Sequence, residues 1–335
     1  MIVDRSRAKS KGTDDLGLET RLDPQLRELI ELVLSEIPAI ADPTPADRRA
    51  LAEIVSPLFR GPGSADISFP VARREATAVS EDGFPVRVWI YEPTHQAPSS
   101  TLLYIHGGGW VAGSLESYDI DVRRLATQTG MSVVAVDYRL APEARRPSAI
   151  EDCVAAARLV LDSATLPPLL ALAGDSAGGN LALEVAIRLK NTGTMLAGLL
   201  LFYPVVDPGA LNNRSYNENG NDFLLTREDM AYYWNAYLHD GPESFIAQAP
   251  FAPEHLRGLP PTVLLTAGFD PLRDEGRELA ASLIGSDVPL TYLPNPTLTH
   301  GFQQMVPRVD AATTAIGTAY RELRQLIERF TGEPL

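Results

Sequence analysis

A glycine-x-serine-x-glycine segment between a predicted strand and a predicted helix constrains this chain more than any other feature. Residues 174–178 read Gly-Asp-Ser-Ala-Gly, directly after the apolar run LLALA and two residues before LALEVAIRLK. Glycines on both sides allow a sharp bend that presents the serine hydroxyl at the carboxyl end of the strand. The alternative is an ordinary glycine turn in which the serine caps the helix. We expect Ser176 to be a nucleophile at the edge of a sheet.

Strands and helices alternate on both sides of this turn. Several of the expected strands are short continuous apolar runs, which is typical of strands buried on both faces of a parallel sheet. The β-rich runs are residues 75–80, 86–91, 102–105, 132–136, 169–173, 196–202, 262–267 and 290–293. A hairpin-like turn, Glu81-Asp82-Gly83, separates the first two runs, so the sheet is expected to begin antiparallel and continue parallel. The fold class is therefore α/β, with a mostly parallel eight-stranded sheet flanked by helices.

Two segments stand apart from this alternation. Residues 21–60 predict two amphipathic helices, and the turn-rich segment 61–66 (GPGSAD) is the candidate junction with the remaining chain. A stretch at about 208–250 has no strand signal and contains an aromatic helical pattern, so it is expected to be an insertion placed over the sheet. The expected division is an N-terminal helical part, residues 1–60, and a main unit, residues 61–335.

A serine nucleophile needs a base, and five histidines are available. His95, His239 and His255 lie in turn-like or loop segments, and His106 precedes three glycines. His300 follows a late strand in the loop LTHGF, where the Ser-acid-His order of the serine-turn motif places the base. Elimination and chain order therefore favour His300 over the usual structural role of a lone histidine.

The acid that orients the base is expected between the serine and the histidine in sequence, at the end of a strand. Asp270 follows the strand-like residues 262–268 and meets this requirement. An aspartate before a proline is also a good helix N-cap, so a structural role is an equal alternative for this residue on its own. Asp274 is the rival acid, but it lies one turn into the following helix.

The segment His106-Gly107-Gly108-Gly109-Trp110 follows the predicted strand 102–105. Glycines let the backbone approach a substrate, so their N–H groups, with that of Ala177, can stabilise an oxyanion. The same residues fit a dinucleotide-binding G-x-G-x-x-A pattern, with Asp137 as the ribose-binding acid. That alternative is weaker, because Asp137 lies 28 residues past Gly109 rather than about 20, and it leaves the serine turn unexplained.

Five motifs together resemble the hormone-sensitive-lipase-like branch of the α/β-hydrolases, the microbial family IV esterases. They are HGGGW at 106, YRLAPE at 138, GDSAGG at 174, DPLRDEG at 270 and HGF at 300, and the similarity spans about residues 70–330 in the order and spacing of the family. The resemblance implies the α/β-hydrolase fold, with Ser176 as nucleophile, His300 as base and Asp270 as the acid that orients it.

The resemblance also implies the remaining site. Gly108, Gly109 and Ala177 would be the oxyanion donors, with Gly107 left open as a further candidate. Trp110 and Tyr203 would lie near the substrate. Residues 1–60 and the insertion at about 208–250 would form a helical cap that carries the substrate pocket. Neither a metal nor a cofactor is expected.

The composition excludes several classes of binding partner and limits where the protein is expected to act. With 29 basic and 43 acidic residues the net charge is −14, which disfavours nucleic acid and anionic lipid surfaces as partners. The longest strongly apolar stretch, residues 196–206, is short of the roughly 20 residues of a spanning helix, and no signal peptide is visible. The single cysteine, Cys153, excludes an intrachain disulfide and fits a reducing compartment. We expect a cytoplasmic protein without stable membrane association. The sequence is compatible with a homodimer.

The leading functional hypothesis is a serine esterase that hydrolyses small-molecule carboxylic esters of short to medium acyl chain through an acyl-enzyme. The same machinery would serve an amidase, a lactonase or a deacetylase of small molecules. A ligand-binding receptor on the same fold is a further alternative, but all three positions of the Ser-His-Asp set are filled. Cys153 is expected to be a buried packing residue.

Overall fold

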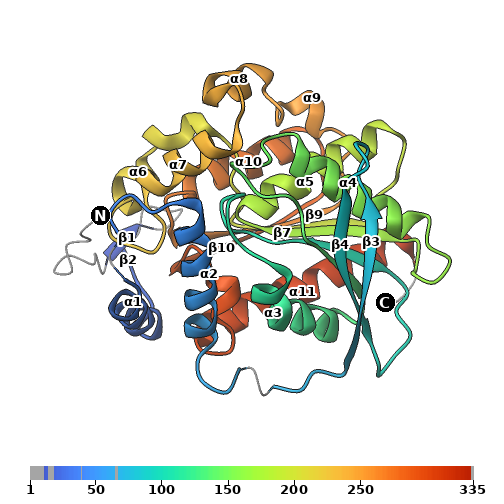
Figure 1. The fold of residues 1–335 in the computed structure, drawn as a ribbon, viewed down its shortest axis with the longest axis horizontal. Coiled ribbons are helices and arrows are strands. Elements are labelled where there is room, and N and C mark those ends of the chain that lie inside the picture. Colours follow the sequence, from blue (N-terminus) through green and yellow to red (C-terminus); the bar gives the residue numbers. More distant parts are fainter. Residues whose placement is uncertain (1–10, 14–18, 39, 65–66, 333–335) are drawn as a thin grey trace.

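An eight-stranded sheet forms the centre of the protein in the computed structural model, which describes all residues except 1–10, 14–18, 39, 65–66 and 333–335 (Figure 1). The strands are β3 (Val71–Val79), β4 (Pro85–Pro93), β5 (Thr101–Ile105), β6 (Ser132–Val136), β7 (Leu170–Asp175), β8 (Gly198–Phe202), β9 (Thr262–Phe269) and β10 (Leu290–Thr299). Their spatial order is β10-β9-β8-β7-β5-β6-β4-β3. The β3–β4 and β4–β6 pairs are antiparallel and the others are parallel, which confirms the predicted fold class.

Most strand boundaries lie close to the predicted ones, but the two edge strands are longer. β3 pairs with β4 over its whole length, from Val71 to Val79, although most of its side chains are exposed. β10 continues through Pro294 and Pro296 to Thr299, with a shift of register after Asn295. Prolines and polar residues are tolerated at a sheet edge because one side of the strand needs no partner. Edge strands therefore lack the continuous apolar run that marked the central strands.

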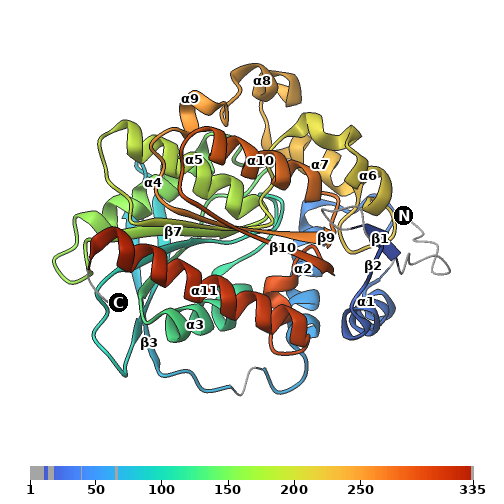
Figure 2. The same cartoon turned by 180° about the vertical axis from the view of Figure 1, so that it is seen from behind.

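Helices cover both faces of the sheet (Figures 1 and 2). One face carries α3 (Leu115–Thr129) and α11 (Asp310–Thr331), and the other carries α4 (Ser148–Leu161), α5 (Ala177–Asn191) and α10 (Arg273–Gly285). The two apolar layers between sheet and helices are separate clusters, as the alternation of side chains along each strand requires. No helix in the described part of the chain is long and apolar enough to cross a membrane.

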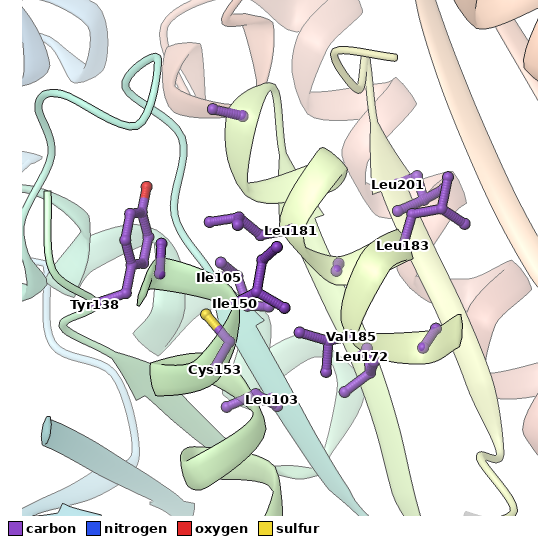
Figure 3. Close-up of a cluster of buried hydrophobic side chains, with 14 of the residues drawn as sticks. Leu103, Ile105, Tyr138, Ile150, Cys153, Leu172, Leu181, Leu183, Val185 and Leu201 are labelled. Carbon is purple, nitrogen blue, oxygen red and sulfur yellow. The ribbon is translucent and has the colours of Figure 1, made fainter. Parts of the chain in front are cut away.

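The layer under α4 and α5 is closely packed (Figure 3). Leu103, Ile105 and Leu172 from the sheet meet Ile150 and Val185 from the two helices, and all are fully buried. Cys153 lies in this layer, where burial raises the pKa of its thiol well above the ordinary value. The prediction that Cys153 is a packing residue is confirmed.

The N-terminal part contains the two expected helices, α1 (Pro24–Glu36) and α2 (Pro45–Arg60). Asp23 caps α1, and Thr44 forms a capping box with Asp47 at the start of α2. A short hairpin of β1 (Lys11–Thr13) and β2 (Glu19–Arg21) precedes them and had no counterpart in the prediction, because three-residue strands leave too little periodic signal. Residues 1–10, 14–18 and 39 of the predicted 1–60 segment lie outside the described residues.

The segment between β8 and β9 is strand-free over its described residues, as expected. It contains the 3-10 helix η2 (Pro208–Asn212) and the helices α6 (Arg214–Asn219), α7 (Arg227–Tyr237), α8 (Gly241–Gln248) and α9 (Pro253–Leu256). In both views α6 and α7 lie beside α2, at the same end of the sheet (Figures 1 and 2). The N-terminal helix α2 and the helices α6 and α7 of the 208–250 segment, which are far apart in sequence, therefore lie side by side.

Candidate active site

Ser176 lies in a sharp turn between β7 and α5. Its backbone has φ 54° and ψ −121°, a conformation that is strained for a residue with a side chain. The flanking glycines are required by close packing: a Cβ at Gly174 would lie 2.2 Å from the carbonyl oxygen of Gly178. A Cβ at Gly178 would lie 2.1 Å from the carbonyl oxygen of Ile105. The glycines thus bring the helix start against the neighbouring strand and leave the serine hydroxyl accessible to a histidine.

Ser176, His300 and Asp270 are joined by hydrogen bonds. The Nε2 atom of His300 lies 2.9 Å from the Ser176 Oγ, and its Nδ1 atom lies 2.8 Å from an oxygen of Asp270. Each of the three follows the carboxyl end of a parallel strand, β7, β9 or β10, so the topology brings them to one edge of the sheet. The His300 side chain is 12% exposed and that of Asp270 is 1% exposed. This geometry meets the requirements of a Ser-His-Asp triad.

Asp270 also has the structural role that the sequence allowed. One carboxylate oxygen faces His300, and the other accepts a hydrogen bond of 2.8 Å from the backbone N–H of Leu272. The rival acid, Asp274, is engaged elsewhere: it forms ion pairs with Arg273 and Arg277. Asp270 therefore anchors the histidine and the following turn at the same time.

The glycine loop after β5 provides free backbone N–H groups. Gly108 and Gly109 line the cavity beside Ser176, with φ values of 115° and 61° that favour glycine. Within the described part of the chain, the N–H groups of Gly108, Gly109 and Ala177 have no hydrogen-bond acceptor. The N–H of Gly107 donates instead to Asp175, at 2.9 Å. Gly107 is thus not a free donor, and Gly108, Gly109 and Ala177 are available for an oxyanion.

Asp175 is a buried carboxyl group that motif reading did not single out. It accepts hydrogen bonds from the hydroxyls of Tyr104 (2.7 Å) and Tyr118 (2.9 Å) as well as from Gly107. Burial raises the pKa of Asp175 from 3.8 to about 6, although these hydrogen bonds act in the opposite direction. Because it lies next to Ser176, the carboxylate ties the glycine loop to the nucleophile turn. Its position between the motif glycine and serine was the one available sequence signal.

A cavity of about 360 Å³ contains Ser176 and His300 in its wall. Its lining is mostly apolar and comes from the helical segments on both sides of the site. α1, its C-cap residue and α2 contribute Val33, Leu34, Ile37, Leu51, Ala52, Val55 and Phe59, and the segment between β8 and β9 contributes Phe223, Leu224, Leu225, Met230 and Tyr233. No motif marks these residues, because apolar side chains in helices are equally typical of an ordinary core.

Trp110 and Tyr203, predicted to lie near the substrate, are not among the described residues that line the cavity. Trp110 is fully buried and stacks on Tyr237 at 4.3 Å between ring centroids. Tyr203 is also buried and packs edge-on against His300 at 4.7 Å. A large aromatic ring gains more from full burial than from a cavity wall. Tyr203 lies against His300 without facing the cavity, and the expectation that Trp110 and Tyr203 lie near the substrate stays a prediction.

The dinucleotide-binding alternative receives no support from the geometry. Asp137, its ribose-binding candidate, forms an ion pair of 2.9 Å with Arg87 and does not line the cavity. Gly107 is held by Asp175 rather than open to a pyrophosphate. The glycine loop belongs to the serine site.

The sheet order, the serine turn and the Ser-His-Asp contacts define an α/β-hydrolase. The family model described as alpha/beta hydrolase fold matches residues 102–304, more than half of the chain. The chain belongs to this family, in the hormone-sensitive-lipase-like branch that its motifs indicated.

Proteins similar to this chain carry names that describe ester hydrolases. The chain is 35% identical over 270 residues to the carboxylesterase NlhH of Mycobacterium tuberculosis, covering 77% of this chain and 84% of that protein. It is 38% identical over 226 residues to the carboxylic ester hydrolase LipN of the same organism, covering 63% of this chain but 59% of LipN, less than two thirds of that relative. A solved hyperthermophilic esterase from the archaeon Pyrobaculum calidifontis superposes with a TM-score of 0.81 at 30% identity, over 92% of this chain and 99% of that one.

Proposed function

We propose that this protein is a carboxylic-ester hydrolase in which Ser176 forms an acyl-enzyme. The observation that carries the proposal is the continuous set of hydrogen bonds from Ser176 through His300 to Asp270 at the wall of the cavity. The ester-hydrolysing relatives and the esterase structure support the same reaction class.

The residues have separate roles in this reaction. A serine hydroxyl is a weak nucleophile at neutral pH, so Nε2 of His300 accepts its proton as Oγ attacks the ester carbonyl. Asp270 keeps the imidazole oriented and stabilises its charged form. The N–H groups of Gly108, Gly109 and Ala177 stabilise the oxyanion, and His300 then protonates the departing alcohol. Water, deprotonated by His300, releases the acid from Ser176.

The cavity supports esters of short to medium acyl chain. About 360 Å³ of mostly apolar space accommodates a small ester, and α1, α2 and the 208–250 segment supply most of its lining. The charge of −14 favours neutral substrates over anionic ones. We place the acyl and alcohol parts of the ester against these two helical segments.

The test is the variant Ser176→Ala with 4-nitrophenyl butanoate as substrate. We expect turnover to fall by about 10⁴- to 10⁶-fold, since removal of a triad serine has effects of this size. Ser35→Ala is the matched control, because Ser35 is an exposed serine on α1 outside the cavity lining. Stopped-flow absorbance should also show a burst of nitrophenol from the wild type, and intact mass should show the butanoyl group on the protein.

Retention of more than a few per cent of activity in Ser176→Ala would remove Ser176 as nucleophile. The matched anilide and lactone substrates, measured beside the ester, compare the amidase and lactonase alternatives that use the same residues. An ester that reacts more slowly than its anilide would overturn the ester assignment.

A further inference from the structure

One positive side chain, Arg48, lies in the wall of the mostly apolar cavity. It is the one lysine or arginine among the described lining residues, and its side chain is 10% exposed. Guanidinium groups are rarely buried unless paired, so the contacts of Arg48 decide what it does.

Arg48 pairs with Asp229 and contacts the Tyr233 side chain, but its Nε atom is left without an acceptor. Its Nη1 atom donates to one oxygen of Asp229 on α7 at 2.9 Å. The other oxygen of Asp229 is taken by Thr226, through the hydroxyl at 2.6 Å and the backbone N–H at 3.2 Å. The buried Nε atom of Arg48 has no hydrogen-bond acceptor within the described part of the chain. A buried donor without an acceptor is costly, and a guanidinium presents five N–H groups.

Aromatic rings hold this guanidinium in place. Its central carbon lies 4.0 Å from the ring centroid of Tyr232 and 5.1 Å from that of Tyr233. The Tyr233 ring also packs against the glycine loop after β5, because a Cβ at Gly109 would lie 2.4 Å from Tyr233 Cγ. One tyrosine side chain therefore separates Arg48 from a backbone donor of the reaction centre. The position of α2 beside α7 is visible in both views of the fold (Figures 1 and 2).

We propose that Arg48 binds a neutral oxygen acceptor, a carbonyl or ether oxygen, on the ester substrate. This inference rests on the proposed function and names the substrate class: esters that carry a second oxygen a few atoms from the scissile bond. A neutral acceptor fits better than a carboxylate, because Asp229 already balances the charge of Arg48 and Asp175 lies in the same cavity wall.

The experiment compares esters that differ by one atom. One pair places the oxygen in the acyl chain, 4-nitrophenyl 3-ethoxypropanoate against 4-nitrophenyl hexanoate, and the other places it in the alcohol, 2-methoxyethyl butanoate against butyl butanoate. Each kcat/KM is divided by the rate of hydroxide hydrolysis of the same ester, which removes intrinsic reactivity. The oxygen-to-methylene ratio is the corrected kcat/KM of the oxygen-containing ester divided by that of its methylene counterpart. In at least one pair this ratio should be about tenfold or more lower in the Arg48→Met variant than in the wild type.

Two further variants separate recognition from support of the fold. Arg48→Lys keeps the positive charge and should restore part of the ratio. Arg49→Met removes the next arginine of α2, which bonds to Glu143 and to the carbonyls of Val111 and Ala141 outside the cavity, and should leave the ratio at the wild-type value. Thermal denaturation of each variant checks folding.

An equal loss for both members of each pair in Arg48→Met would overturn the proposal, because it would make Arg48 a clamp between α2 and α7. If Arg48→Met does not fold, the test uses the wild-type protein alone. A tenfold higher kcat/KM for the methylene ester in both pairs, after division by the rate of hydroxide hydrolysis, would contradict an acceptor site. Hydrolysis of none of the four esters by the wild type would overturn the proposed function itself, a result distinct from loss of the ratio.

Discussion

Asp175 shows how a single side chain couples the serine turn to the glycine loop. Its carboxylate lies between two tyrosine hydroxyls and receives the N–H of Gly107. This contact removes Gly107 from the oxyanion donors and leaves the next two glycines free. A Cβ at Gly107 would lie 2.4 Å from an oxygen of Asp175, so the loop approaches the carboxylate more closely than another residue would allow.

The raised pKa of Asp175 predicts a pH-dependent stability. Burial lifts the pKa from 3.8 to about 6, so between these values the folded protein holds a proton that the unfolded chain has released. The contribution of Asp175 to stability is therefore complete below about pH 4 and is lost as pH rises through about 6. Its full size is on the order of 3 kcal/mol.

Asp175→Asn should remove this component. The free energy of unfolding, from urea titrations at pH 4, 5, 6 and 7, should decline less with rising pH in the variant than in the wild type. Parallel pH profiles for the two proteins would show that Asp175 titrates in the folded state as it does in the unfolded chain.

At the scale of elements, α2 is attached to the catalytic sheet through α3 by a buried ionic cluster. Arg60, at the end of α2, donates to an oxygen of Asp121, and Arg124 donates to the other oxygen at 2.8 Å. All three side chains are at most 6% exposed. Arg60 also donates to the backbone carbonyl of Ser117, a residue of the cavity wall. The cluster therefore holds the helix that carries Arg48.

We expect Asp121→Asn to destabilise the protein by about 3–5 kcal/mol, because two buried guanidinium groups lose their counter-charge. The control is Glu92→Gln, which breaks the exposed pair with Arg74 and should cost at most about 1 kcal/mol. Denaturant titration at pH 7 compares the two variants. Similar losses in both would mean that the cluster is no stronger than a surface ion pair.

The whole molecule carries 14 more negative than positive charges. Such an excess attracts cations and repels anions over distances that salt shortens. For butanoylcholine, kcat/KM should fall by about two- to tenfold between 20 and 500 mM NaCl, and for ethyl hydrogen succinate it should rise. Ethyl butanoate, a neutral ester, is the control. A salt response of the same sign for all three esters would point to an effect on the protein rather than on its encounter with the substrate.

The cytoplasmic location and the homodimer stay predictions.

Much of this architecture was predictable where local physics decides it. The central strands, the two helices of residues 21–60 and the serine turn depend on neighbours in sequence, and each agrees with the structure. The β1–β2 hairpin and the extension of β10 were missed because their residues carry no continuous apolar run. The burial of Trp110 and Tyr203 outside the cavity lining was not predictable, because a motif shows that an aromatic residue is near a site, but not which way its ring turns.

Short-range backbone preferences were enough to single out the candidate site residues from sequence: a serine at a strand-to-helix turn, one histidine in a suitable loop and an acid after a late strand. The tertiary structure alone decided the surroundings. Ser176 and His300 meet across 124 positions of sequence, and Arg48 and Asp229 across 181. Long-range packing selects such neighbours, and apolar helices such as α1 and α2 carry no local signal of what they will cover.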